Sequence, residues 1–246
     1  MIPSIAIVPQ PPLLVPELVG AAAAEIEPLS TACQQAVLRS ATRRWHAVGV
    51  DGSGPARVES GASGSFRGYG ADVPVRLGSG PLAGGTGQAV PPGGLPLPML
   101  VAGWLCGLAG AHVVTGELVH PATEPTGCLA RGKELVDELS REPGSDWSVL
   151  VLADGARTHD APGAGRVDGR AAGFDAAVAE ALAAADAEAL AAIDPRLADE
   201  LGAQGRAAWQ VLAGVAIGSG SDWTGELLYS AAPYGVGYHV ALWRPR

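Results

Sequence analysis

The chain has little charge of either sign and few basic residues in particular. Only 17% of its 246 residues are Asp, Glu, Lys or Arg, and its 16 Lys and Arg are scattered rather than gathered into a stripe. The formal net charge of -9 would repel a phosphate backbone, so we expect no nucleic-acid partner. Because 48% of the residues are hydrophobic, the chain can bury a large core and need not form more than one domain.

Cysteine is also scarce and forms no recognisable pattern. Cys33, Cys106 and Cys128 make neither an even set for disulfides nor a CxxC pair, so we interpret them as inert buried thiols in a reducing compartment. The first apolar stretch, which ends at Val8, is too short for a signal sequence and has no basic residues before it. These features predict a cytoplasmic protein.

Fingerprints of nucleotide and hydrolase sites are missing. Neither GxGxxG nor GxSxG occurs in the sequence, so a dinucleotide fingerprint and a nucleophile elbow are both absent. Residues Gly127 to Lys133 have the spacing of a phosphate-binding loop, but Glu134 replaces the Ser or Thr that would hold Mg²⁺. We also expect no strand before this stretch, and the motif therefore carries no nucleotide site.

A membrane span is not expected either. The longest apolar stretch runs from Leu97 to Val114, but Pro98, His112 and several glycines interrupt it. We interpret it as a buried helix whose glycines allow close packing. The sequence thus predicts no membrane partner.

What the sequence does contain is an alternation of short apolar runs and helical patterns. Apolar runs at 4–8, 45–50 and 147–152 have the length of buried strands, and 21–39 has helical spacing. Residues 171–215 are alanine-rich and helical, and 225–243 alternates enough for one or two closing strands. This pattern predicts an α/β fold: a single domain over 1–246 with a mostly parallel central sheet flanked by helices. Residues 78–94, rich in Gly and Pro, are expected to form a flexible surface loop.

Polar residues follow the expected strands at their carboxyl ends. Gln10 follows the first strand, Asp51 and Ser53 follow the second, and Asp154 and His159 follow the strand at 147–152. Ligands of open α/β sheets usually bind beyond the carboxyl ends of the strands. We therefore predict a pocket lined by Gln10, Asp51, Ser53, Asp154 and His159, with Asp154 and His159 as the catalytic candidates.

Several phrases carry a family resemblance. In chain order they are Ile5 to Leu18, Gly64 to Gly70, Ala153 to Gly155, Ala207 to Gly214, and Ala232 to Tyr238. The chain resembles the subunit-B-like class III extradiol ring-cleavage dioxygenases, the group that includes the protocatechuate 4,5-dioxygenase beta chain, and looks like an alanine-rich actinobacterial branch of it. The resemblance implies the fold of that subunit.

The resemblance also implies what the iron site should contain. In the active enzymes two histidines and a glutamate hold iron(II), and a further histidine acts as acid and base toward a catechol. Here Gln10 stands at the first histidine position, and the second-strand histidine is replaced by the loop from Asp51 to Gly54. A neutral amide is a weak ligand for iron(II), so we expect no metal ligands and no cofactor. Iron(II) is expected only if the enzyme is active with another ligand set.

Other titratable and aromatic residues each allow a functional or a structural interpretation. His159 resembles the acid-base histidine of the family, although the phrase before it is longer here; otherwise it is a solvated loop histidine beside Asp160. His46 lies inside a strand and is expected to be a core or edge histidine. Glu226 is a conceivable metal carboxylate without a partner at a fixed spacing. Tyr69 and the phrase from Tyr234 to Tyr238 are expected to be structural.

Two classes of function follow. The first is a dioxygenase-like protein with a degraded iron site that binds a small aromatic molecule or a partner without catalysis. The second is a working enzyme: an oxidoreductase on an aromatic diol with a non-standard metal site, or a metal-free hydrolase or lyase that uses Asp154 and His159. The resemblance is also compatible with a homodimer.

Overall fold

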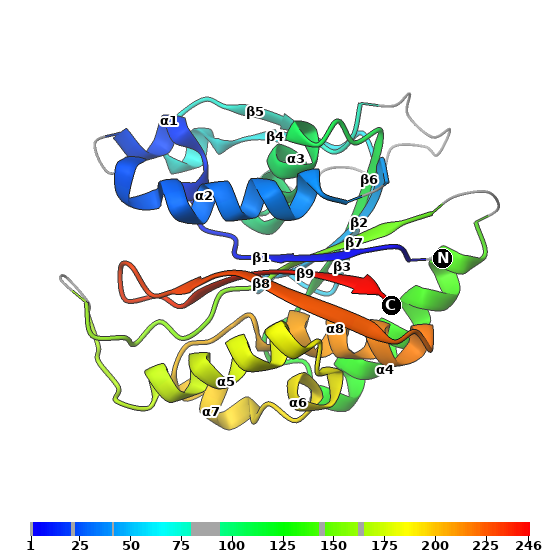
Figure 1. Ribbon diagram of the computed structural model, residues 1–246. Coiled ribbons are helices and arrows are strands. Elements are labelled where there is room, and N and C mark those ends of the chain that lie inside the picture. Colours follow the sequence, from blue (N-terminus) through cyan, green and yellow to red (C-terminus); the bar gives the residue numbers. More distant parts are fainter. Residues whose placement is uncertain (1, 21–22, 41, 80–93, 143–145, 162–164) are drawn as a thin grey trace.

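A seven-stranded mixed sheet forms the centre of the protein (Figure 1). The computed structural model describes residues 2–20, 23–40, 42–79, 94–142, 146–161 and 165–246. The strand order is β3-β6-β2-β7-β1-β9-β8. The strands are β1 (Ile5–Val8), β2 (Arg44–Val50), β3 (Ala56–Val58), β6 (Val113–Val119), β7 (Ser148–Leu152), β8 (Trp223–Ala231) and β9 (Tyr238–Pro245).

The expected parallel arrangement holds only for the middle of this sheet. Strands β6, β2, β7 and β1 pair in parallel, whereas β3, β9 and β8 each pair antiparallel to their neighbours. Connection length explains the antiparallel pair of β8 and β9, because a parallel pairing needs a crossover of a dozen or more residues. A short turn joins β8 to β9, so these two strands run in opposite directions. The α/β class is therefore confirmed, with a mixed sheet instead of a mostly parallel one.

Helices cover both faces of the sheet in separate layers (Figure 1). One layer holds the short α1 (Pro16–Val19), α2 (Ala23–Leu38), α3 (Leu97–Leu108), the single 3-10 turns η1 (Pro12–Leu14) and η3 (Phe66–Tyr69), and a small sheet of β4 (Ser63–Ser65) and β5 (Pro74–Arg76). The other layer holds α4 (Pro125–Ser140), α5 (Ala171–Ala184), α6 (Ala187–Ala191), α7 (Pro195–Glu200) and α8 (Arg206–Ser219).

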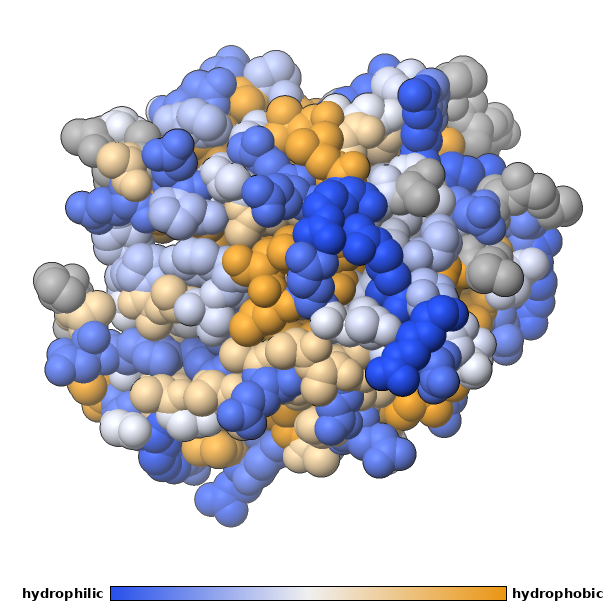
Figure 2. Space-filling view, in the orientation of Figure 1, coloured by the Kyte–Doolittle hydropathy of each residue, from blue (hydrophilic) through white to orange (hydrophobic). Residues whose placement is uncertain are grey.

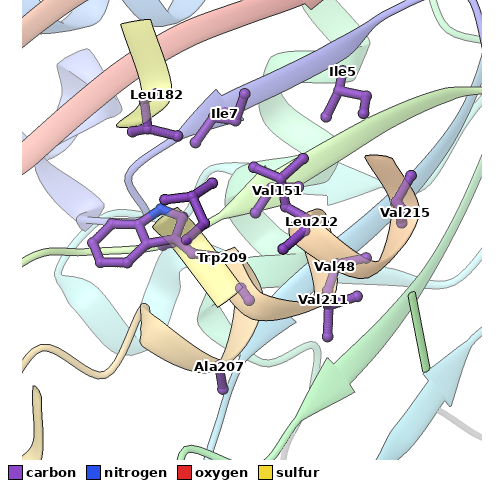
Figure 3. Packing of buried hydrophobic residues seen from close by; sticks show 14 of the residues in the cluster. Ile5, Ile7, Val48, Val151, Leu182, Ala207, Trp209, Val211, Leu212 and Val215 are labelled. Atoms are coloured by element: carbon purple, nitrogen blue, oxygen red, sulfur yellow. The ribbon is translucent and has the colours of Figure 1, made fainter. Parts of the chain in front are cut away.

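Each strand contributes alternate side chains to two hydrophobic cores. Ile5 and Ile7 of β1 belong to the core beneath α8, and Ala6 and Val8 belong to the core beneath α2 and α3. This alternation follows from the period of two along a strand. Figure 3 shows the first core, in which Trp209 and Leu212 of α8 face the side chains of the sheet. Helix α8 is buried from Arg206 to Ala216, so it acts as the centre of its layer.

The stretch with phosphate-loop spacing is part of a packed helix. Residues Gly127 to Lys133 lie inside α4, and a Cβ on Gly132 would come within 2.2 Å of the Val211 carbonyl oxygen. Glycine here permits the close approach of α4 to α8. Contrary to the sequence prediction, the strand β6 precedes α4. The apolar stretch from Leu97 to Val114 contains the whole of α3 and the start of β6, because the chain turns at Gly110, whose φ is 65°.

Asp194 caps α7 by accepting a hydrogen bond from the Arg196 N–H, and Pro195 is the first residue of that helix. Several local predictions from the sequence are confirmed. His46 is a buried core residue of β2, and its Nδ1 lies 2.9 Å from Oγ1 of Thr115. The three cysteines are buried and free. Among the described residues, none of the helices is both long and apolar enough to cross a bilayer. Most of the expected loop at 78–94 lies outside the described residues.

Strand β8 forms one outer edge of the sheet. A register shift between Leu227 and Tyr229 interrupts its pairing with β9. The Glu226 carboxylate, considered above as a metal ligand, is held by two nitrogens of Arg39 at 2.9 and 2.6 Å. Glu226 is therefore part of a surface ion pair with Arg39. Near this edge, hydrophobic residues reach the surface between α2 and β8 and are bordered by hydrophilic ones (Figure 2).

Candidate functional site

Neighbouring strands send their connections to opposite faces of the sheet. After β1 the chain enters the layer of α2, whereas after β7 it enters the layer of α5 (Figure 1). Strands β1 and β7 are parallel neighbours, so a crevice opens between their carboxyl ends. Strand β2, on the other side of β7, leads to α3 in the first layer and widens the same crevice.

A cavity of about 290 Å³ occupies this crevice. Its apolar wall includes Pro12, Val50 and Leu97. A cavity of about 150 Å³ suffices for benzene, so this one accommodates a substituted ring. Its polar side chains come from Gln10, Asp154, Arg157, Gln204 and Tyr238.

Gln10, which follows β1, forms hydrogen bonds with residues at the ends of β7 and β2. Its backbone N–H donates to Oδ1 of Asp154 at 2.9 Å, and its side-chain Nε2 donates to the Val50 carbonyl oxygen at 3.3 Å. The Oε1 atom of Gln10 is buried and has no hydrogen-bond partner in the part of the chain that the structure describes. A buried acceptor without a partner is rare in proteins and marks a place where a ligand donor can bind.

Asp154 is a half-buried carboxyl group in the cavity wall. Burial raises its pKa to about 6, although the Gln10 N–H, Arg157 and His239 act in the opposite direction. The group therefore changes between a neutral donor and a carboxylate at pH values close to neutrality. This property suits a group that accepts or donates a proton, or one that hydrogen-bonds a ligand hydroxyl.

Arg157 and Tyr238 complete the polar lining. The Arg157 side chain is exposed, and its guanidinium makes no ion pair or hydrogen bond with any described residue. Its backbone N–H is fixed by the Leu201 carbonyl oxygen at 2.9 Å. Tyr238 is buried at the start of β9, and burial together with the nearby Asp154 raises the pKa of its phenol.

A second polar group lies next to the cavity, centred on Asp175 of α5. Its Oδ2 is 2.5 Å from Nε2 of His159, and its Oδ1 is 3.3 Å from Nε2 of His239. The Ala156 N–H donates to the same carboxylate, at 3.2 Å from each oxygen. On its other side, the His239 ring contacts Ser230 Oγ through Nδ1 at 3.0 Å. The carboxylate thus contacts both rings, but only His159 makes a hydrogen bond to it, and Nε2 of His239 has no hydrogen-bond partner among the described residues.

Asp175 and His239 were missed in the sequence, although each leaves a signal there. Asp175 stands on the face of α5 that carries Val178 and Leu182, at helical spacing. His239 shares a face of β9 with Ala241 and Trp243. In both cases a charged or polar residue stands in a series of apolar residues that is expected to be buried. Such a buried polar group needs a hydrogen-bonding partner, which is the signal that could have revealed it.

The structure brings together only part of the predicted pocket. Gln10 and Asp154 are in direct contact, but Asp51 and Ser53 pair with each other and do not line the cavity. Oδ1 of Asp51 accepts from the Ser53 N–H at 2.8 Å and from its Oγ at 2.6 Å, which closes a local turn. His159 faces Asp175 and is not part of the cavity wall.

The two predicted structural tyrosines have different positions. Tyr69 packs edge-on against Phe66, with ring centroids 6.2 Å apart, and is partly exposed. The Tyr234 hydroxyl donates to Oε2 of Glu25 at 2.6 Å. Tyr238, from the same phrase as Tyr234, lines the cavity, so this part of the phrase contributes to the candidate site as well as to the sheet.

A larger hollow of about 480 Å³ lies between β3, β6 and α4. Its central charge is the buried Glu117, which Arg131 contacts through Nε at 3.0 and 3.1 Å and through Nη2 at 2.7 Å. His46 lies 3.5 Å from the same carboxylate. Burial acts to raise the pKa of Glu117, but the contacts with His46 and Arg131 outweigh it and hold that pKa below its ordinary value. The buried carboxylate of this hollow is therefore already paired with side chains of the protein itself.

The donor set of the strand-end cavity does not suit iron(II). Gln10 supplies a neutral amide, Asp154 a single carboxylate, and the rings of His159 and His239 are directed to Asp175. In the described residues, no group of three or more His, Cys, Asp or Glu side chains is arranged to hold a metal ion. Comparison of the sequence with models of protein families gave no match, and neither did comparison with curated proteins.

Proposed function

We propose that the chain is a dioxygenase-like protein that binds a small aromatic molecule in the strand-end cavity and lacks the iron site of the class III extradiol enzymes. The proposal rests on one observation: Gln10 and Asp154, which follow different strands, meet in the wall of a cavity large enough for a substituted ring. Gln10 stands where the resemblance expects the first metal-binding histidine. On this proposal the protein keeps a cavity at the strand ends but lacks the metal-binding residues of the enzymes that it resembles.

Loss of iron follows from the same residues. A facial triad needs three strong donors, and among the described residues the cavity wall has Asp154 as its only carboxylate and no histidine. We therefore assign this cavity a binding role, in which Asp154 and Tyr238 hydrogen-bond the polar groups of the ligand.

An active enzyme is the second candidate, favoured by the group around Asp175. Two histidines and two aspartates, Asp154 among them, lie in one neighbourhood at the carboxyl ends of the strands. In an oxidoreductase acting on an aromatic diol, Asp154 would accept a proton from the diol. In a metal-free hydrolase or lyase, Asp154 and His159 would both act as proton donors or acceptors.

The two candidates are separated by binding and turnover measurements. Catechol and phenol would be titrated into the protein and followed by NMR, together with oxygen uptake and elemental analysis of protein purified without chelators. Leu97→Trp should block the cavity and abolish binding, whereas Leu108→Trp, at an exposed position of the same helix, should leave it unchanged. Binding without oxygen uptake supports the first candidate. Catechol-dependent oxygen uptake with stoichiometric iron supports the second, and absence of binding contradicts both.

A further inference from the structure

We propose that the protein forms a two-fold dimer in which the outer edge of β8 pairs antiparallel with β8 of a second copy. The contact surface, called the β8 face, consists of β8, residues 31–38 of α2, and helix α5. Both helices contact β8, one from each layer (Figure 1). The two-fold axis is perpendicular to the sheet, so α2 meets α2 and α5 meets α5 of the second copy, and the two sheets continue into one.

The first argument is the backbone of β8. This strand is the last in the sheet and is nine residues long, whereas β3 at the opposite edge has only three. Alternate residues of an edge strand direct their N–H and C=O groups away from the sheet. On that side β8 makes no backbone hydrogen bond with any described residue. Such an edge is a template for a further strand.

The second argument is that the edge has few of the features that keep strand edges apart. Strand β8 contains no Lys, Arg or Pro, and its only charged residue, Glu226, is paired with Arg39. The irregularity between Leu227 and Tyr229 does protect an edge, but regular strand lies on both sides of it. Two copies of β8 can therefore pair without like charges facing each other, unless the axis passes through Glu226.

The third argument is the apolar character of the surface beside the edge. Leu38, at the end of α2, is 57% exposed, and hydrophobic side chains reach the surface between α2 and β8 (Figure 2). Gln35 and Thr31, which α2 exposes one and two turns earlier, are uncharged. The exposed positions of α5 are five alanines, one glycine and a single charged residue, Glu180. Side chains this small let two helices approach closely.

The fourth argument is the size of the β8 face. Nine residues, at about 3.3 Å each, extend about 30 Å along the strand. With a helical layer about 10 Å thick on each side of the sheet, the face measures roughly 30 by 25 Å, or about 750 Å². Each partner in a standard protein interface contributes about 800 Å². A two-fold contact uses this same face on both copies and is closed, so assembly stops at the dimer.

Charge also favours this face for contact between two copies. With a formal net charge of -9, two chains repel each other in most orientations. Beside β8, however, two arginines accompany Glu226: Arg39 forms the ion pair with it, and Arg244 donates to the Arg39 carbonyl oxygen at 3.2 Å. The negative excess of the chain is therefore not located at this edge.

The first test measures self-association by sedimentation equilibrium, at up to about 100 µM protein. We expect a dimer, and we expect Leu38→Lys to raise its dissociation constant at least ten-fold, because the symmetry places two added charges in one apolar contact. Leu108→Lys is the matched control, since Leu108 is 47% exposed on α3, outside the β8 face, and it should leave the constant unchanged. The thermal midpoint checks folding. If Leu38→Lys lowers it, Gln35→Lys adds the same charge at another exposed position.

The second test asks whether β8 itself forms the contact. Cysteine is introduced singly along the strand and treated with a short bismaleimide; the variants are Thr224→Cys, Glu226→Cys, Leu228→Cys and Ser230→Cys. In an antiparallel pair related by a two-fold axis, the residue nearest the axis lies opposite its own counterpart. We therefore expect one of these positions to form a covalent dimer. The three native cysteines are buried, so the wild type serves as the unreactive control.

The outcomes are decisive and do not depend on what the strand-end cavity binds. A protein that sediments as a monomer overturns the inference. A dimer that both Leu38→Lys and Gln35→Lys leave intact, or in which no cysteine of β8 links to its counterpart, is formed by another surface and overturns it as well. Assemblies that grow beyond the dimer with concentration would contradict the closed two-fold contact. Loss of the dimer in Leu38→Lys together with a linked β8 position supports it.

Discussion

A Cβ atom on Gly237 would lie 1.9 Å from Oδ2 of Asp175. Gly155 approaches the same carboxylate, with an added Cβ 2.4 Å from Oδ1. Two glycines from different segments thus leave the space that the carboxylate occupies. The segments are joined directly as well, because Gly155 N–H donates to the Gly237 carbonyl oxygen at 2.7 Å.

The first prediction concerns this space. Gly237→Ala should destabilise the protein by about 2 kcal/mol, because the buried carboxylate cannot move without losing its donors. Gly173→Ala is the matched control: an added Cβ there has no atom within 4 Å, and alanine favours the helix. Urea unfolding followed by circular dichroism measures both. Equal stability of Gly237→Ala and the wild type would show that the carboxylate is not held in place.

The second prediction concerns pH. The pKa of Asp154 in the folded protein, about 6, is above the ordinary value of 3.8, so the folded state favours the protonated form. This contribution to stability is present below pH 4 and is lost as the pH rises through 6. Asp154→Asn removes the titration and should gain stability relative to the wild type between pH 4 and pH 7, by up to about 3 kcal/mol. A pH-independent difference in unfolding free energy would contradict it.

Glu117 should show the opposite dependence. The lowered pKa means that its contribution to stability is present above the unfolded value and is lost as the pH falls. Glu117→Gln should cost about 2 kcal/mol at neutral pH, because Arg131 loses its buried partner. Glu134→Gln, which alters an exposed partner of the same arginine at 3.2 Å, should cost less than about 0.5 kcal/mol. Equal effects of the two variants would place the main ion pair elsewhere.

A fourth prediction concerns iron. Protein purified without chelators should contain far less than one iron per chain, and Gln10→His should not change this. A single added imidazole would still lack partners, since His159 and His239 are directed to Asp175 and Asp51 is engaged with Ser53. Elemental analysis decides the matter. Stoichiometric iron in the unaltered protein would show that another set of residues forms the site.

Much of the fold was predictable because strands and helices leave local patterns. The runs at 4–8, 45–50 and 147–152 correspond to β1, β2 and β7, and the helical region at 171–215 covers α5, α6, α7 and most of α8. Strand β6 was missed since it follows α3 after a short turn, within one apolar stretch. Hydrophobicity alone cannot separate a buried helix from a buried strand there.

The site was less predictable for a different reason. Gln10 and Asp154 could be placed together because the ends of parallel strands share an edge. The loop after β2 closes on itself through Asp51 and Ser53, and no rule of spacing shows this. Arg157 and Tyr238 enter the cavity through the pairing of residues 155–159 with 235–237, which depends on the whole fold.

The hydrogen bond between Gln10 and Asp154 joins residues separated by 144 positions. The cavity wall also includes Gly202 and Tyr238, so its parts come from segments that are far apart in the sequence. The segment up to β6 emerges first and contains Gln10 and Val50 but none of Asp154, Arg157 or Tyr238. The wall of the strand-end cavity is therefore complete only once β9 has paired with β1.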